Sequence, residues 1–141
     1  MQIFNQTINI FVANWQAFIN QVLIDNRCNN IKCTLRLIED EKKLGCCRNL
    51  TKNEYLILLN KKFLYISNKK SIRKILYHEI AHALDHYFNN KMSHSKSFND
   101  LCRFLNCPDA IGAYADIEEE IKFIKENSKE SVVEKAQKLL S

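Results

Sequence analysis

The feature that most constrains the fold is a helical pattern of apolar side chains between Ser71 and Asn90. These side chains recur at steps of three and four residues: Ile72, Ile75, Leu76, Ile80, Ala83, Leu84, Tyr87 and Phe88. Residues spaced in this way share one face of an α-helix, so the pattern predicts a long buried helix that ends at Asn89 and Asn90. Ionisable side chains lie in the same helix, and buried ionisable groups need a partner.

These ionisable side chains form the motif His78-Glu79-Ile80-Ala81-His82. Residues four apart on a helix are separated by about 400° of rotation and about 6 Å along the axis, so both imidazoles can reach one ion. Zn²⁺ binds imidazole nitrogens and, in catalytic sites, keeps one coordination position for water. We therefore expect His78 and His82 to bind zinc and Glu79 to act as the general base. The alternative for the two histidines is hydrogen bonding within an apolar core.

A catalytic zinc site has three protein ligands, and the remaining histidines are His86 and His94. His86 lies eight residues after His78, about 12 Å along a straight helix, which is too far for both rings to bind one ion. His94 follows the reversal expected at residues 89–93, where a second helix can fold back and present it opposite His82. His94 is therefore the preferred third ligand.

Two other side chains of this helix are expected near the metal without binding it. His86 continues the stripe of the motif, and we expect it at the rim of the site or behind a ligand. Asp85 lies about one turn beyond His82, where it can accept the free ring N–H of a ligand histidine. A solvent-facing position is the alternative for Asp85.

Patterns elsewhere in the chain indicate a helix-rich α+β fold. The N-terminal segment carries Phe4, Ile8, Phe11, Trp15, Phe18 and Val22 at helical spacing. Strand-like patterns follow at residues 34–38, after Gly45 and at residues 55–60, and a short helix is expected at residues 97–105. We expect a single domain over residues 1–141, with a small antiparallel sheet packed beside the motif-bearing helix and a charged helical tail at residues 109–141.

The composition is typical of a globular protein. Of 141 residues, 46% are hydrophobic and 26% charged, with only 2 Gly and 1 Pro, which excludes collagen-like, low-complexity and disordered classes. No apolar run is long enough to span a membrane, and the N-terminal sequence lacks the basic region of a signal peptide. We therefore expect an intracellular protein, cytoplasmic or nuclear, that has no membrane partner.

The six cysteines are expected to be free thiols or metal ligands in such a compartment. Cys28 and Cys33 have the same spacing as Cys102 and Cys107, at the loose end of zinc-binding pairs. A second, structural zinc site is one interpretation of these four residues. Buried thiols are the other.

Positive charge is concentrated in residues 42–74, which hold ten Lys and Arg and a single acidic residue, Glu54. Such a stretch can bind nucleic acid through the release of counterions from phosphates. A solvated lysine-rich surface explains the same composition. The partners expected are therefore a protein or peptide substrate and, through residues 42–74, nucleic acid.

Several segments together resemble the SprT-like zinc metalloproteases. They are Gly45 in a hairpin, the strand Ile57-Leu58-Leu59-Asn60, the motif at residues 78–82 and His94-Ser95-Lys96-Ser97-Phe98. In that family the last motif usually reads His-Gly-x-x-Phe/Trp, so Ser95 replaces the usual Gly. The resemblance covers about residues 30–108 and implies a zincin-like metalloprotease domain. It also implies that the motif histidines and His94 bind zinc and that Glu79 is the catalytic base.

The resemblance does not extend to every feature of the family. SprT-like proteins often carry a C-terminal zinc ribbon with paired C-x-x-C motifs, whereas residues 109–141 contain no cysteine. The family is associated with DNA-bound protein substrates, and the basic residues 42–74 are compatible with such substrates.

A second resemblance shares the chemistry but not the third ligand. The sequence His-Glu-Ile-Ala-His-Ala-Leu-Asp-His followed by Ser-x-Ser-Phe is also similar to lethal-factor-type toxin metalloproteases. Their third ligand is a downstream Glu, which here would be Glu118, Glu119 or Glu120. The strand before the motif fits the SprT-like pattern better, and a solvated helix face explains the acidic cluster.

Two classes of function follow from these observations. The first is a zinc metallopeptidase, in which Glu79 takes a proton from water and passes it to the leaving amine. The second is a non-catalytic zinc-containing module that binds nucleic acid or protein. Cleavage that depends on Glu79 separates the two.

Overall fold

The computed structural model describes residues 2–40, 43–65, 68–115, 117–118 and 122. Its elements follow along the chain in the order α1 (Gln2–Asp25), β1 (Lys32–Ile38), β2 (Gly45–Thr51), β3 (Glu54–Asn60), the 3₁₀ helix η1 (Lys61–Tyr65), α2 (Lys69–Asn89), α3 (Lys96–Phe104) and the 3₁₀ helix η2 (Pro108–Gly112). Each helix and strand predicted before residue 106 is present. Most of the helical tail expected at residues 109–141 lies outside the described residues.

The helix-rich α+β fold class is confirmed, and the sheet is mixed rather than wholly antiparallel. Its strand order is β1-β3-β2, with β3 parallel to β1 and antiparallel to β2. A tight turn joins β2 to β3 as a hairpin, and β3 then inserts between β2 and β1. The central position of β3 explains its nearly continuous apolar sequence, because a central strand has no free edge and little exposed surface.

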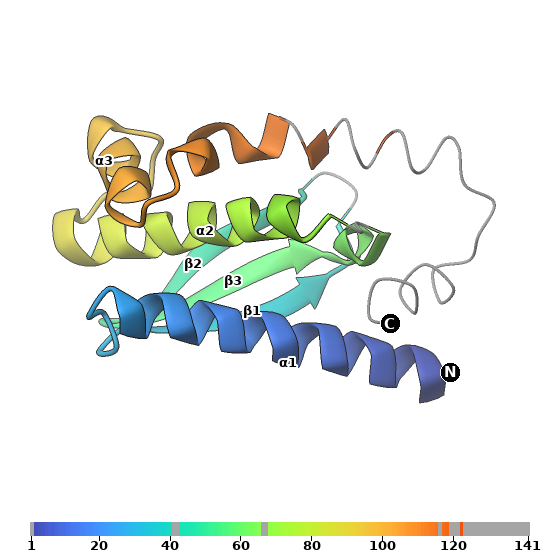
Figure 1. Cartoon of the computed structure of the whole chain (residues 1–141). Coiled ribbons are helices and arrows are strands. Elements are labelled where there is room, and N and C mark those ends of the chain that lie inside the picture. The colour runs from blue at the N-terminus through green and yellow to red at the C-terminus, as the bar shows by residue number, and fades with distance from the viewer. Residues whose placement is uncertain (1, 41–42, 66–67, 116, 119–121, 123–141) are drawn as a thin grey trace.

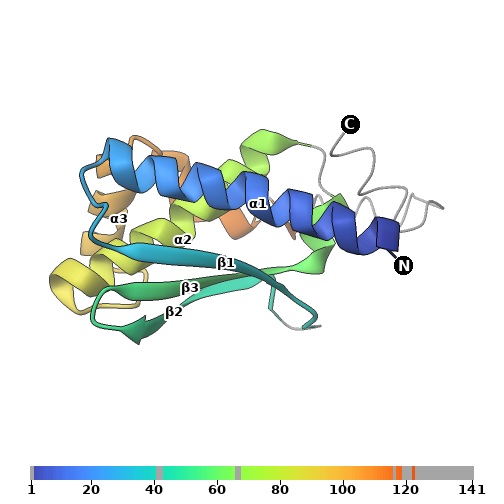
Figure 2. The same cartoon turned by 90° about the horizontal axis from the view of Figure 1, so that it is seen from below.

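Both long helices cover the same face of this sheet. Residues paired across strands point to one face, and Leu35, Ile57 and Cys47 stand side by side and pack in the apolar core. The same core contains Ile19 of α1 and Ile80 of α2. Figures 1 and 2 show α1 along β1, and Figure 1 shows α3 and η2 on the side of α2 that faces away from α1. Packing from several sides explains why all residues of α2 from His78 to Asp85 are buried.

Two polar side chains fix the edges of the sheet. Gln16 of α1 accepts a hydrogen bond from Leu35 N and donates one to the Cys33 carbonyl, both at 2.7 Å, so it completes the outer edge of β1. At the end of β3, Asn60 donates to the Lys43 carbonyl at 3.0 Å, and its backbone N–H donates to the Leu44 carbonyl at 2.8 Å. Asn60 thereby holds the chain that enters β2.

Both ends of α2 carry polar caps, and the predicted end at Asn89 and Asn90 is confirmed. Asn68 is the N-cap, and its side chain accepts a hydrogen bond from Lys70 N. Asn90 is the C-cap in the left-handed conformation, with φ of 56°, which asparagine tolerates better than most residues. Among the described residues, no helix is both long enough and apolar enough to cross a membrane.

Candidate metal centre

Three histidine side chains meet beside α2. His78 and His82 come from successive turns of α2, and His94 comes from the connection between α2 and α3. The Nε2 atom of His94 lies 3.2 Å from the Nε2 atoms of both His78 and His82. No other group of three or more His, Cys, Asp or Glu side chains in the described part of the chain is arranged to hold a metal ion. The structure therefore brings together the three histidines that the sequence singled out.

A hydrogen bond on the far side of His78 determines which of its ring nitrogens is available. Its Nδ1 lies 2.7 Å from the carbonyl oxygen of Ala110. A carbonyl oxygen can only accept, so Nδ1 carries the proton and donates. The Nε2 of the neutral ring then presents a lone pair to the point where the three rings meet. Since Ala110 belongs to η2, the segment after α3 orients a side chain of α2.

The arrangement of the three nitrogens fits a divalent cation. His94 Nε2 has two close nitrogen neighbours, and one ring proton can satisfy only one of them, whereas a shared cation satisfies every lone pair. Two imidazoles bound to one Zn²⁺ at tetrahedral angles have nitrogens about 3.3–3.4 Å apart. The observed separations of 3.2 Å are close to this spacing. The three-histidine group can therefore bind a metal ion.

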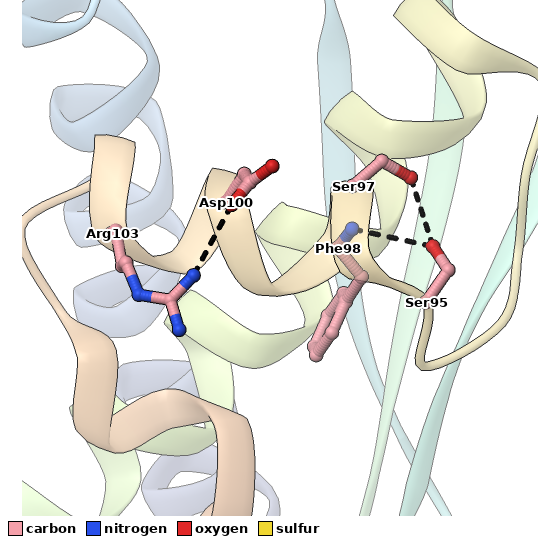
Figure 3. A network of polar contacts seen from close by, with 5 residues as sticks. All are labelled: Ser95, Ser97, Phe98, Asp100 and Arg103. Carbon is pink, nitrogen blue, oxygen red and sulfur yellow. Dashed lines mark hydrogen bonds and ion pairs between the residues drawn. The ribbon is translucent and has the colours of Figure 1, made fainter.

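The start of α3 fixes His94 and supplies an aromatic wall. Ser95 is the N-cap of α3, and its Oγ accepts a hydrogen bond from Phe98 N at 3.4 Å and lies 2.8 Å from Ser97 Oγ (Figure 3). The ring of the fully buried Phe98 stacks on His82, with centroids 4.3 Å apart. Ser95 thus fixes the backbone directly after His94.

Glu79 is buried beside the histidines and is held by Tyr114. The residue is 2% exposed, and the hydroxyl of Tyr114 donates a short hydrogen bond to its Oε2. No other described group forms a hydrogen bond with this carboxylate. Burial and the adjacent Glu79 raise the pKa of Tyr114 well above its usual range, so the hydroxyl remains a donor.

Burial shifts the pKa of each ionisable group in the direction that favours its neutral form. It raises the pKa of Glu79 to about 7, while the hydrogen bond from Tyr114 acts in the opposite direction. Burial lowers the pKa of His82 to about 4, with further lowering by His78 and His94. It also lowers the pKa of His78. Both buried imidazoles are therefore neutral near pH 7, the form that binds metal ions.

A cleft of about 500 Å³ opens beside these groups. The three histidines, Glu79 and Tyr114 line it together with Gly45, Cys46 and Cys47 at the start of β2. A ligand in this cleft can therefore reach the nitrogen atoms and the carboxylate at the same time.

Asp85 lies behind the histidines and is bonded to other partners. It is fully buried, accepts a hydrogen bond from Asn89 Nδ2 at 2.9 Å, and lies 3.5 Å from Ser95 Oγ. Within the described residues it forms no hydrogen bond to a histidine, and Nδ1 of His82 is buried with no hydrogen-bond partner. Asp85 therefore links α2 to the cap of α3, whereas the backbone of Ala110 orients a ligand histidine.

The remaining candidate residues lie outside the three-histidine group. His86 faces the sheet, where its Nδ1 lies 2.8 Å from the hydroxyl of Tyr55. Glu118 is exposed and lines the cleft, but it does not join the metal-binding group. Glu119 and Glu120, the other acidic candidates for the third ligand, lie outside the described residues.

Within the part of the chain that the structure describes, the cysteines form no second metal site. All six are free, and no three of Cys28, Cys33, Cys102 and Cys107 are close enough together to hold an ion within the described structure. Cys28, Cys33 and Cys102 are buried, which agrees with the interpretation as thiols of the core.

Sequence reasoning did not single out Tyr114 or Ala110. Both lie in a segment interpreted only as the beginning of a charged tail. A weak signal was present, because Ala110, Ala113 and Ile117 follow one another at steps of three and four residues, and all three are buried. That spacing predicts a short apolar face, which places the adjacent Tyr114 close to the core.

Residues 12–122 of the chain match the sequence model of the SprT-like family. The chain belongs to the SprT-like family. No curated protein and no solved structure matches it. The match extends beyond the expected residues 30–108 at both ends. It includes most of α1 and the segment that carries Ala110 and Tyr114, so the contacts to His78 and Glu79 lie within the family domain.

Proposed function

We propose that this SprT-like protein is a zinc-dependent endopeptidase. His78, His82 and His94 hold the metal ion, and Glu79 is the general base. The observation that carries the proposal is the convergence of three Nε2 atoms beside a buried glutamate in an open cleft. Family membership supports the same conclusion.

The donor set favours zinc or a neighbouring transition metal over Mg²⁺ and Ca²⁺. All three donors are imidazole nitrogens, which suit zinc and neighbouring transition metals, whereas Mg²⁺ and Ca²⁺ prefer oxygen. Three protein ligands leave a coordination position open, as catalytic zinc sites require. Metal analysis of the purified protein, followed by removal and reloading with Zn²⁺, Co²⁺ or Mn²⁺, tests the identity of the ion.

The residues around the site have the properties that peptide hydrolysis needs. When bound, the cation supplies a Lewis acid that polarises a peptide carbonyl and makes water more acidic. Glu79 accepts the proton of the attacking water and returns it to the leaving amine. Burial favours the protonated form of Glu79, so the carboxylate is disposed to accept the proton of the water.

The decisive experiment replaces the base without removing a ligand. Glu79→Gln keeps the shape of the side chain, so we expect full zinc content and a loss of cleavage of an unfolded protein substrate by about 10²- to 10⁴-fold. Glu54→Gln, at the start of β3, is the matched control and should cleave normally. Cleavage by Glu79→Gln at the wild-type rate would reject the mechanism.

A second pair of variants tests the third ligand. His94→Ala should lose zinc, whereas Glu118→Ala should retain it, because Glu118 lines the cleft but does not join the three-histidine group. Loss of zinc only in Glu118→Ala would favour the toxin-type arrangement. A stoichiometric zinc content without cleavage by the wild type would favour a non-catalytic binding module.

Nucleic acid is the second partner that we propose. Lys43, Arg48, Lys52, Lys69 and Lys70, all in the basic stretch 42–74, are exposed. Exposed cations of this kind can neutralise phosphates and direct the protein to substrates bound to nucleic acid. Affinity for a DNA duplex should then fall steeply as the salt concentration rises, and an affinity that salt does not change would contradict this role.

A further inference from the structure

The hydroxyl of Tyr114 lies where three parts of the structure meet. It donates a hydrogen bond to Oε2 of Glu79 on α2. It also occupies the place that a Cβ atom on Gly45, at the start of β2, would need. The Tyr114 ring meets His78 edge to face, with centroids 5.0 Å apart and planes at 86°. One side chain from the segment after η2 therefore contacts both the motif-bearing helix and the strand that borders the cleft.

Lack of space explains the glycine at position 45. Gly45 has no positive φ, so no special backbone conformation requires it. A Cβ atom there would lie 2.8 Å from the Leu58 carbonyl oxygen and 3.2 Å from Leu59 Cδ2, in addition to its overlap with the Tyr114 hydroxyl. An added Cβ atom cannot move away from the hydroxyl, because the Leu58 carbonyl oxygen and Leu59 lie close to it. A side chain at position 45 would therefore displace the hydroxyl from Glu79.

The hydrogen bond restricts how Glu79 can present its carboxylate. A glutamate side chain has several rotatable bonds, and fixing them before the reaction removes an entropic cost from the reactive geometry. Tyr114 bonds to Oε2, and no described group bonds to Oε1. The contact therefore leaves one oxygen of the carboxylate to accept a proton.

From these contacts we infer that Tyr114 is a positioning residue for Glu79, and that Gly45, which has no side chain, leaves the space that the Tyr114 hydroxyl needs to reach Glu79. The inference rests on the proposed peptidase function. Tyr114→Phe removes the hydroxyl and keeps the ring against His78. We expect its kcat to fall about 10- to 100-fold, with KM within about twofold and zinc content unchanged, because the variant keeps the ring that lines the cleft and alters no ligand.

Two further variants complete the kinetic test. Gly45→Ala keeps the tyrosine but displaces its hydroxyl, so kcat should fall as in Tyr114→Phe. Tyr87→Phe is the matched control, because the Tyr87 hydroxyl accepts a single hydrogen bond from Asn30 at 2.9 Å, away from the cleft. Its kcat should equal that of the wild type. If Gly45→Ala does not fold, Tyr114→Phe and its control still decide the question.

A double-mutant cycle provides a readout that does not depend on cleavage. The melting temperatures of the wild type, Tyr114→Phe, Glu79→Ala and the double variant are measured with zinc and with chelator. If the hydroxyl acts on Glu79, the decrease in the double variant should be smaller than the sum of the single decreases. Either additive decreases or a wild-type kcat in Tyr114→Phe would overturn the inference.

The two readouts separate this inference from the proposed function. If the wild type binds zinc and cleaves no substrate, the peptidase proposal fails and the role of Tyr114 in catalysis fails with it, whatever the cycle shows. If the wild type cleaves and Tyr114→Phe cleaves equally fast, only the positioning role fails.

Discussion

Ser95 illustrates how one hydroxyl group supports the metal centre without touching it. Its Oγ accepts the hydrogen bond of Phe98 N and caps α3 directly after His94. We expect Ser95→Ala to lower the free energy of unfolding of the metal-free protein by about 1 kcal/mol, whereas Ser95→Gly should cost only a few tenths. Urea unfolding in the presence of chelator measures both. An unchanged free energy of unfolding in Ser95→Ala would show that the cap does not stabilise α3.

The site residues differ in how far the sequence alone predicts them. The histidines of the motif and Glu79 follow from helical spacing, because residues four apart share a face. His94 required the further assumption of a chain reversal, which the structure contains at the end of α2. Tyr114 could not be predicted with them, because its contact with Glu79 joins residues 35 positions apart and no local pattern encodes it.

At the level of elements, a polar side chain of α1 hydrogen-bonds the backbone of the edge strand β1. Gln16 pairs with both Leu35 N and the Cys33 carbonyl. Gln16→Ala leaves these backbone groups without their partner, so we expect the free energy of unfolding to fall by about 1–3 kcal/mol.

The matched control for this prediction lies on the same helix. Gln21 donates a hydrogen bond to Asp25, one turn further along the exposed surface of α1. Gln21→Ala should therefore change the stability by less than about 0.5 kcal/mol. Chemical denaturation measures the free energy of unfolding of both variants. Similar decreases in the two would mean that the hydrogen bonds of Gln16 to β1 add no stability beyond that of an exposed contact.

The elements themselves were easier to predict than their arrangement. Apolar spacing predicts α1, α2, α3, β1 and β3, because each must bury a face. The direction of pairing between β1 and β3 was not predictable in the same way. It depends on β3 inserting between β1 and β2, and the alternation of side chains is the same in a parallel and an antiparallel pair.

For the whole molecule, a metal ion bound by His78, His82 and His94 would join α2 to the connection that leads into α3. A ligand that binds only the folded state stabilises it by about 2.7 kcal/mol at a concentration of 100 Kd. We expect Zn²⁺ under these conditions to raise the melting temperature by about 5–10 °C. In a chain of this size, 1 kcal/mol of stabilisation raises the melting temperature by roughly 2–4 °C.

This increase in melting temperature should require the three-histidine group and should not require the histidine outside it. His94→Ala removes a donor and should abolish the zinc-dependent increase. His86→Ala, on the same helix as two of the donors but bonded to Tyr55, should keep it. Thermal melts with zinc and with chelator measure the increase in each protein, and an equal increase in His94→Ala would place the ion elsewhere.

The stability of the metal-free protein should depend on pH through two buried groups that have opposite effects. The pKa of His82 falls from 6.5 to about 4 on folding, so the unfolded chain binds more protons between these values and stability is lost as the pH falls through this window. The pKa of Glu79 rises from 4.5 to about 7, so the folded state binds more protons and stability is lost as the pH rises through that window.

Comparison with Glu79→Gln isolates the second of these effects, because the variant keeps every other titrating group. The glutamine has no proton to release, so the penalty that grows with pH in the wild type is absent. The free energy of unfolding of Glu79→Gln minus that of the wild type should therefore increase between pH 4.5 and about 7. Urea unfolding with chelator across this range measures the difference. Parallel stability curves would mean that the pKa of Glu79 is the same in the folded and the unfolded protein, and that burial beside the histidines does not raise it.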